Sequence, residues 1–324
     1  MPTSPTALIL GGTGSLWVSA LHLARAGWSV IVTGREPSRL PGAAAEFGIR
    51  FVAAERDDEQ ATEALVGDGV DLLVDGQGYA PGQARALAAL SRRCGGTAYL
   101  SAKAVYVDAC GHHLNSPGGA HFDAPVTEAG PTMAWQAQEV RSAEGYGAGK
   151  AESERLLAEH GERVSVLRPS KIHGPWVRQV RSAPVLDLVA PRGGATGGSR
   201  GRDPVSVAGP DVVESTTSAE VLARAVLACA RAPRARVLNV ADADPRPAGE
   251  LAREVWRAAG CSPVPEVVPA DPREAPDAAR LPWRVAMVLD TSALSALGVS
   301  LPTFAETAWM EVEWVLRQRR SQAS

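Results

Sequence analysis

Two residues at helical spacing, Tyr146 and Lys150, form the pair in this sequence best suited to proton chemistry. Residues four apart on a helix lie one turn apart on the same face. A cation at that distance favours the phenolate, so the spacing predicts a Tyr146 pKa lowered from about 10 toward neutral pH. A phenol of this kind can move a proton to or from a substrate oxygen. We therefore take Tyr146 and Lys150 as candidate catalytic residues.

A glycine-rich turn, Gly11-Gly-Thr-Gly14, lies between an apolar run at 7–10 and a helical pattern that follows. Backbone N–H groups of such a turn, together with the helix N-terminus, bind anions, typically the pyrophosphate of a dinucleotide. A third glycine at the same spacing would fall at position 17, where this chain has Trp17. Either the helix stands off the sheet or the indole turns away. The alternative to nucleotide binding is a purely structural turn.

The end of the second predicted strand, 29–33, indicates which dinucleotide would bind. A carboxylate there would hold the ribose 2′-OH of NAD, whereas an arginine accommodates the 2′-phosphate of NADP. This chain has Thr33-Gly-Arg35 at that point. The pattern favours NADP over NAD, with Arg35 as a candidate cofactor ligand. The alternative is that Arg35 is a solvated surface residue.

Lysine is rare in this sequence. Of the 33 basic residues only Lys103, Lys150 and Lys171 are lysines. Arginine keeps its proton in proteins and has a bulky planar head, whereas lysine is a compact ammonium whose pKa responds to its surroundings. The lysines that remain are therefore candidates for positions where arginine would fail. The alternative is that three scattered lysines share no role.

Strands and helical patterns alternate over the first half of the chain. The predicted strands cover residues 7–10, 29–33, 49–53, 70–74, 97–101, 164–168 and 237–240. Such alternation predicts an α/β fold of Rossmann type, a doubly wound parallel sheet. Residues 107–140 lack periodicity and predict a long surface excursion. We expect an NAD(P)-binding domain over 1–175 and a smaller, mainly substrate-binding region over 176–324, with one strand and one helix of that region rejoining the sheet.

Several segments carry a resemblance to a known family. They are Gly11-Gly-Thr-Gly14, Tyr99-Leu-Ser-Ala-Lys-Ala-Val-Tyr106, Tyr146-x-x-x-Lys150, Arg168-Pro…Gly174-Pro175, Leu238-Asn-Val240 and Asp290-Thr-Ser…Leu297-Gly298. In this order they resemble the extended (atypical) short-chain dehydrogenase/reductases, the NAD-dependent epimerase/dehydratase family. The resemblance covers nearly the whole chain.

The resemblance implies roles for individual residues. Tyr146 would be the general acid/base, and Lys150 would bind the nicotinamide ribose and tune the tyrosine. The residues implied in cofactor binding, besides Lys150, are Gly11, Gly12, Thr13, Gly14, Ser15, Leu16, Gly76, Gln77 and Pro169. Lys171 stands where many relatives carry an asparagine near the substrate pyrophosphate, and His173 beside it would contact substrate or simply pack. Homodimers paired through residues 81–93 and 146–160 are expected by the same analogy.

The sequence departs from the family beside the site. The family's Ser or Thr donor normally lies four residues before the tyrosine of its S-S-x-x-V-Y pattern, and here that position holds Ala102. Ser101 is adjacent, but neighbouring strand residues point to opposite faces, so it substitutes only if the strand end bulges or turns. Lys103 is a second candidate, as a charged donor; its alternative is an ordinary solvated strand end. Loss of one such donor typically costs about 10²–10³ in rate.

Other loop residues are weaker candidates. His112, His113 and His121 with Asp123 lack the fixed spacing of metal ligands, so no metal site is predicted and a place at the pocket mouth is favoured. Trp135 and Trp176 would stack on a ring substrate or pack as a lid. The arginines between 192 and 202 would clamp a diphosphate or lie in a surface loop.

Composition limits the range of functions. The chain has 324 residues and a net charge of −3, which argues against a nucleic-acid or anionic-membrane partner. No apolar run approaches the ~18 residues of a membrane span. Four widely spaced cysteines and the absence of a signal-like N-terminus favour reduced thiols in a cytoplasmic protein.

Together the sequence predicts an NADP(H)-dependent oxidoreductase or epimerase-like enzyme acting on a carbinol or ketone of a small polar substrate, a nucleotide sugar or a secondary metabolite. One alternative is a redox-silent relative that performs isomerisation, cyclisation or elimination. Another is a non-enzymatic NADP sensor, against which the presence of Tyr146 argues. Nicotinamide binding separates the first two, and an active Tyr146→Phe variant would favour the sensor.

Overall fold

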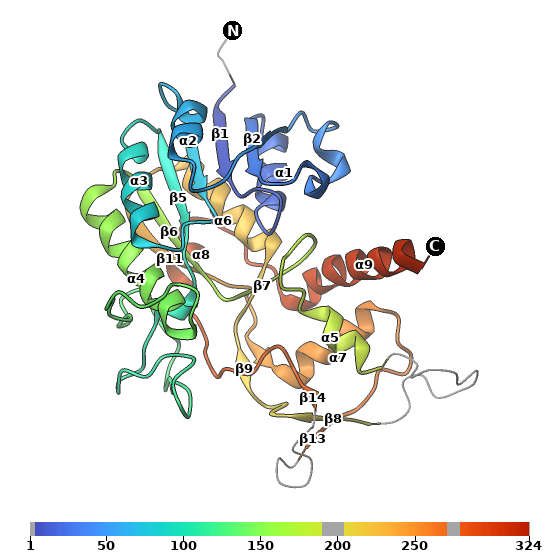
Figure 1. Cartoon of the computed structure of the whole chain (residues 1–324). Helices are drawn as coiled ribbons and strands as arrows, with labels where there is room; N and C mark the ends of the chain where they lie inside the picture. Colours follow the sequence, from blue (N-terminus) through green and yellow to red (C-terminus); the bar gives the residue numbers. More distant parts are fainter. Residues whose placement is uncertain (1–3, 190–203, 271–278, 324) are drawn as a thin grey trace.

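A parallel β-sheet forms the centre of the molecule (Figure 1). The computed structural model describes residues 4–189, 204–270 and 279–323, and within them the sheet has seven strands in the order β11-β6-β5-β4-β1-β2-β3. The strands are β1 (Thr6–Leu10), β2 (Ser29–Gly34), β3 (Arg50–Ala53), β4 (Leu72–Asp75), β5 (Gly96–Leu100), β6 (Val164–Pro169) and β11 (Arg236–Val240). The order reverses between β1 and β4, and loops diverge there to leave a crevice at the carboxyl edge. The predicted Rossmann-type fold is confirmed.

Helices cover both faces of this sheet. One face carries α1 (Trp17–Arg25) and α6 (Ala219–Arg231), and the other carries α2 (Glu59–Val66), α3 (Pro81–Ser91) and α4 (Ala143–His160) (Figure 1). Successive strand residues point to opposite faces, so Leu8 packs in one core and Ile9 in the other. Strands buried on both faces must be apolar throughout, which explains the short apolar runs of the sequence.

Local capping sets where the helices start. The Asp58 side chain accepts a hydrogen bond from the Ala61 N–H at 2.9 Å, and the Ser142 side chain accepts one from the Gly145 N–H at 2.9 Å. Each such cap stabilises a helix by about 1 kcal/mol. The Ser142 cap begins α4 four residues before Tyr146 and so fixes the helical turn on which that tyrosine lies.

The chain after β6 builds a smaller lobe. Its strands are β7 (Lys171–His173), β8 (Val205–Ala208), β9 (Val213–Glu214), β10 (Thr216–Ser218), β12 (Arg246–Pro247), β13 (Val267–Pro269) and β14 (Ala279–Arg280). Its helices are α5 (Ser182–Asp187), α7 (Ala248–Ala258) and α9 (Phe304–Ala323), whereas the short α8 (Ser292–Ser295) packs beside β11 in the core of the main sheet. Trp256, Trp283 and Phe304 are buried in the core that α5, α7 and α9 share. Short 3₁₀ turns occur at Pro37–Arg39, Gly42–Ala44 and Lys103–Val105.

The second half of the chain also returns to the main sheet. β11 pairs in parallel with β6, and α6 packs beside α1 in the core that this face shares. Residues 107–140, all of them described, contain no helix and form only isolated bridges, so this segment does run as a long excursion. None of the described helices is both long and apolar enough to cross a membrane.

Candidate active site

A cavity of about 390 Å³ lies at the carboxyl edge of the sheet, where β1, β4, β5 and β6 end. Its described lining residues are Gly11, Gly14, Ser15, Leu16, Gly76, Gln77, Tyr79, Leu100, Ser101, Ala102, Tyr146, Lys150, Pro169, Ser170, Ile172, Val177, Arg178, Gln179 and Arg181. The structure therefore brings the glycine turn and the Tyr-x-x-x-Lys pair to one cavity. Such a crevice at the carboxyl ends of the strands is where open α/β sheets bind ligands.

Tyr146 lies in the first turn of α4 and is half-buried. Burial raises the pKa of its hydroxyl to about 12, and the neighbouring Tyr79, whose ring centroid lies 6.1 Å away, adds to the rise. This direction is opposite to the one that the Tyr-x-x-x-Lys spacing predicts. Tyr146 therefore keeps its proton at neutral pH and is equipped to donate it.

The contacts of Lys150 explain why the pKa of Tyr146 is not lowered. Its side chain is buried, and its Nζ donates to the Leu100 carbonyl oxygen at 2.5 Å. The same nitrogen lies 4.9 Å from the Tyr79 ring centroid and 4.7 Å from that of Tyr99. Burial lowers the pKa of Lys150 to about 8. The ammonium is held by a carbonyl and two aromatic faces, so the Tyr146 phenol is not its principal partner.

The glycine turn packs closely against Gln77 at Gly11, whereas the space beside Gly14 is open. Gly11 has a φ of +78°, and a Cβ there would lie 2.4 Å from the Gln77 side chain. At Gly14, by contrast, the nearest atom to such a Cβ is the Trp176 carbonyl oxygen, 3.8 Å away. Leu16, at the start of α1, supplies no side-chain cap. First-turn N–H groups without a cap bind anions, so the turn fits a dinucleotide pyrophosphate.

Trp17 does not block this turn. Its side chain is 0% exposed, lies in the core beneath α6 and meets the Trp176 ring edge-on at 6.2 Å. It is absent from the described lining of the cavity. Of the two possibilities that the sequence left open, the indole turns away from the cleft.

A buried ion pair positions Gln77. The Arg56 Nε and Nη2 donate to one oxygen of Asp75 at 3.0 and 2.7 Å, and the other oxygen accepts the Gln77 N–H at 2.8 Å. Asp75 is the last residue of β4, so its carboxylate fixes the loop that enters the cavity. This support was not predicted from the sequence, because the partners lie 19 residues apart on different elements.

Ser101 does not replace the hydroxyl donor that the family pattern would place at position 102. Ser101 lines the cavity, but its hydroxyl donates to the buried carboxylate of Glu154. Arg168 binds the same carboxylate, with its Nη2 2.5 Å from Oε2. Ala102 also lines the cavity and has no hydroxyl.

The other two lysines bind a shared carboxylate outside the cavity lining. Lys103 and Lys171 both donate to Glu214, which is fully buried; the Lys171 Nζ lies 3.0 Å from Oε2 and 2.5 Å from the Pro282 carbonyl oxygen. Neither lysine is among the described residues that line the cavity. Only Lys150 of the three lysines faces the site directly.

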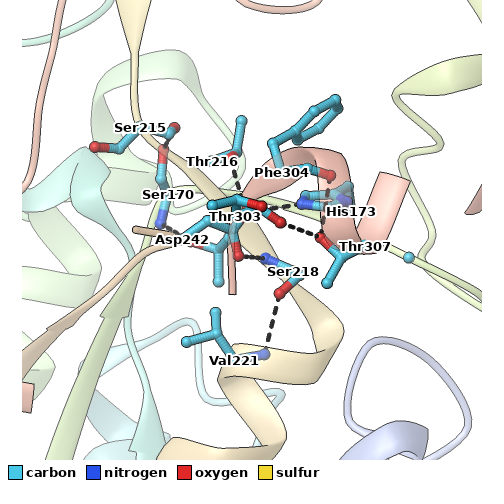
Figure 2. Close-up of polar contacts among 12 residues, drawn as sticks. Ser170, His173, Ser215, Thr216, Ser218, Val221, Asp242, Thr303, Phe304 and Thr307 are labelled. Carbon is cyan, nitrogen blue, oxygen red and sulfur yellow. Dashed lines mark hydrogen bonds and ion pairs between the residues drawn. The ribbon is translucent and has the colours of Figure 1, made fainter. Parts of the chain in front are cut away.

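His173 lies in a buried polar network with Asp242, Thr216 and Ser218 (Figure 2). Its Nε2 is 2.9 Å from Asp242, which also accepts the Thr216 hydroxyl at 2.7 Å and the Ser218 N–H at 2.9 Å. Its ring packs against Phe304 with 4.7 Å between centroids. The His173 side chain is 2% exposed and is not among the described residues that line the cavity. Because it contacts Asp242 and Phe304, it links β7 to the β10 network and to α9.

The remaining candidates are placed as follows. Gly12 packs against Val32, Thr13 lines a neighbouring cavity of about 640 Å³, and Arg35 is exposed just after β2. His112, His113 and His121 each lie near a different carboxylate, at 3.5, 3.8 and 3.0 Å, and the described residues contain no cluster of three metal-binding side chains. Trp135 is half-buried beside α4. The arginines between 192 and 202 lie outside the described residues.

Sequence reasoning did not single out several residues that line the cavity, among them Tyr79, Arg178, Gln179 and Arg181. Tyr79 follows β4 by four positions, so its place at the carboxyl edge was available from the strand order. The three others lie in a segment without periodicity, where only the tertiary fold shows that they approach the site.

Comparisons with solved structures give full-length matches to the fold. A UDP-glucose 4-epimerase from Stenotrophomonas maltophila, crystallised with NAD and formylated UDP-arabinopyranose, aligns with a TM-score of 0.68 at 16% identity, over 99% of this chain and 100% of that one. The Bordetella bronchiseptica enzyme WbmH, in complex with NAD⁺, aligns with a TM-score of 0.67 at 16% identity, over 96% and 98%. A protein of unknown function from Silicibacter pomeroyi aligns with a TM-score of 0.61 at 22% identity, over 94% and 97%. The chain thus shares its overall fold with these three proteins, and this is the Rossmann-type α/β fold that the sequence predicts.

Sequence comparison finds a shorter match. Serine 3-dehydrogenase from Agrobacterium fabrum is 41% identical over 92 residues, which is 26% of this chain and 37% of that enzyme. The match therefore spans little more than a third of the relative's length. No protein-family model matches the chain.

Proposed function

We propose that the protein is an NADP(H)-dependent oxidoreductase or epimerase-like enzyme that acts on a carbinol or ketone of a small polar substrate. The observation that supports it most is that Tyr146, Lys150 and the uncapped start of α1 share one cavity at the carboxyl edge of the sheet. This arrangement combines an anion cradle with a proton donor. Neighbours crystallised with UDP-sugars support a nucleotide sugar, and the partial serine 3-dehydrogenase match supports a smaller hydroxy compound.

Residues of the cavity account for cofactor binding. Residues 11–16 would bind the pyrophosphate. The ribose and nicotinamide would contact Gly76, Gln77, Lys150 and Pro169. The dinucleotide, when bound, supplies or accepts the hydride. Arg35 would bind a 2′-phosphate; the adjacent Glu36, which would otherwise compete for a ribose hydroxyl, is paired with Arg39 at 3.0 Å.

The proton step belongs to Tyr146. Its raised pKa keeps the hydroxyl protonated at neutral pH, so it donates to the developing alkoxide when a ketone is reduced and takes the proton back in the reverse direction. Because Ala102 lacks a hydroxyl and Ser101 is bound to Glu154, Tyr146 works without the neighbouring donor that the family pattern supplies.

Fluorescence titration with NADPH and NADH tests this proposal. We expect NADPH to bind in the micromolar range and more tightly than NADH, and Arg35→Gln to weaken NADPH binding about tenfold while leaving NADH unchanged. Tyr146→Phe should bind NADPH within twofold of wild type and lose about 10²–10⁴ of the turnover measured with a panel of ketones and alcohols. Lack of affinity for either dinucleotide would overturn the proposal.

One observation favours a second function. The commitment of Ser101 to Glu154, beside Ala102, leaves the redox arrangement one donor short, which suits a redox-silent enzyme that performs isomerisation, cyclisation or elimination. Purified protein that binds no nicotinamide yet depends on Tyr146 for activity would support this alternative. Full biological activity of Tyr146→Phe would instead support an NADP sensor.

A further inference from the structure

Tyr79 brings a second phenol into the cavity that holds Tyr146. Its side chain lines the cavity and is 38% exposed. Its ring centroid lies 6.1 Å from that of Tyr146, with 42° between the ring planes, within the range of about 4.5–7 Å over which aromatic rings interact. Burial is the main cause of the raised pKa of Tyr146, and repulsion from the nearby Tyr79 phenolate adds to it. The two phenols therefore belong to one part of the cavity wall.

The hydroxyls of these two tyrosines are available to a ligand. The chain has four tyrosines, and those of Tyr99 and Tyr106 each have a hydroxyl that donates to a protein oxygen at 2.7 Å. Among the described residues, neither Tyr79 nor Tyr146 has a hydrogen-bond partner for its hydroxyl. The two tyrosines whose hydroxyls are unpaired in this part of the chain are thus the two that line the cavity.

The loop that carries Tyr79 is held from two sides. On the α3 side, the Gln83 Oε1 accepts the Tyr79 N–H at 2.7 Å. On the α4 side, the Tyr79 carbonyl oxygen packs against Gly149, where a Cβ would lie 2.9 Å from it. The Lys150 Nζ lies 4.9 Å from the Tyr79 ring centroid, which adds a cation–π contact. The Tyr79 ring is therefore placed by the same helix that carries Tyr146.

Two other hydroxyls of the cavity wall are bound within the protein. Ser101 donates to Glu154, and Ser170 donates to a backbone carbonyl oxygen. At the neighbouring Ala102 there is no hydroxyl. An oxygen that gains negative charge during a reaction is stabilised by donors already aimed at it, and one such donor is typically worth about 10²–10³ in rate. Tyr79 is a donor of this kind that the protein leaves unused.

We propose that Tyr79 is a catalytic residue, whose hydroxyl donates a hydrogen bond to the same substrate oxygen that receives the proton of Tyr146. Tyr79 keeps its own proton throughout, so the transfer of one hydride and one proton stays balanced. Its phenol takes the role that the family pattern gives to a Ser or Thr at position 102. The inference rests on the proposed function and deepens it, since it explains how the site polarises a substrate carbonyl despite Ala102.

Binding of the 4-nitrophenolate ion to the full-length protein tests the proposal without turnover. This ion presents a single anionic oxygen, as a developing alkoxide does, and its absorbance reports binding. At about pH 8 Tyr146 keeps its proton and can donate. We expect saturable binding by wild type and at least fivefold weaker binding by Tyr79→Phe, which keeps the ring beside Lys150. The matched control, Trp309→Phe, alters an aromatic side chain that is 51% exposed and outside the described cavity lining, and should bind as wild type does.

Steady-state kinetics provide a second measurement. With NADPH and the ketone of the panel that wild type reduces fastest, Tyr79→Phe should lower kcat about 10²-fold. The KM for the ketone and the affinity for NADPH should stay within about threefold, because the phenol acts on the reacting oxygen. The double variant Tyr79→Phe with Ala102→Ser restores a hydroxyl to the cavity wall and should regain at least fivefold in kcat.

The outcomes distinguish this inference from the proposed function. A Tyr79→Phe variant that matches wild type within about twofold in either measurement contradicts the role of Tyr79, as does wild type without saturable binding of 4-nitrophenolate. If Tyr146→Phe loses turnover while Tyr79→Phe keeps it, the inference fails and the proposed function stands. The phenolate titration contains no dinucleotide, so its result is independent of the NADPH titration.

Discussion

At the scale of single residues, burial has a larger effect on the pKa values of Tyr146 and Lys150 than their proximity to each other. Tyr146 and Lys150 have the spacing that would make a low-pKa phenol, yet burial moves the phenol pKa up to about 12 and the ammonium pKa down to about 8. Both shifts favour the neutral forms, as desolvation requires.

The Lys150 shift predicts how stability depends on pH. Its pKa is about 8 when folded and 10.5 by reference, so between these values the folded state binds fewer protons than the unfolded chain. The contribution of Lys150 to stability therefore rises with pH across that window. We expect the unfolding free energy of wild type minus that of Lys150→Met to increase from pH 7.5 to pH 9.5 in urea titrations. A constant or falling difference would contradict the shift.

At the scale of elements, helix α1 joins the nucleotide turn to the sheet through an unusual residue. Trp17 stands where a glycine would let helix and strand approach closely, and α6 with Trp176 closes over its indole. The cleft side of the turn stays open because Gly14, rather than position 17, faces it. The tryptophan thus stabilises the α1–α6 layer without entering the pyrophosphate cradle.

Substitution of Trp17 by alanine tests whether the indole contributes to stability and not to cofactor binding. Trp17→Ala should lower the free energy of unfolding by about 3–5 kcal/mol, the range for a buried aromatic. Trp309→Ala, at a side chain that is 51% exposed, should change it by less than about 0.5 kcal/mol. Folded Trp17→Ala at low temperature should still bind NADPH within about threefold. Loss of binding together with unchanged stability would show that the indole belongs to the cofactor site.

At the scale of the whole molecule, α3 and α4 lie together on one outer face of the sheet (Figure 1). Three small residues of these helices, Ala84, Ala88 and Ala151, are buried within the single chain. Ala89 and Ala158 on the same helices are exposed. A homodimer paired here would use these outer positions.

Sedimentation velocity tests this arrangement. A homodimer would have twice the chain mass of 33.8 kDa. Ala158→Arg places a long cation on the α4 face and should convert the dimer to single chains, whereas Ala305→Arg on α9 should leave it intact. Wild type that sediments as a single chain at micromolar concentration would rule out stable pairing.

The part of the fold that sequence predicted best is the part with repeated local patterns. Apolar runs followed by helical patterns located all seven strands of the main sheet. The short strands of the smaller lobe, such as β8 and β14, were not predicted. β14 has two residues, too few to form a periodic pattern, and β8 pairs with segments that lie far away in the chain.

By itself the sequence determined the order of strands and helices, the place of the glycine turn and the shared face of Tyr146 and Lys150, because these follow from backbone preferences over a few residues. Only the tertiary structure decided which way the Trp17 indole turns and that Lys103 finds Glu214, 111 residues away. It also decided the direction of the Tyr146 pKa shift. Burial and long-range ion pairs depend on what the whole chain packs around a group, and spacing along the chain does not contain that information.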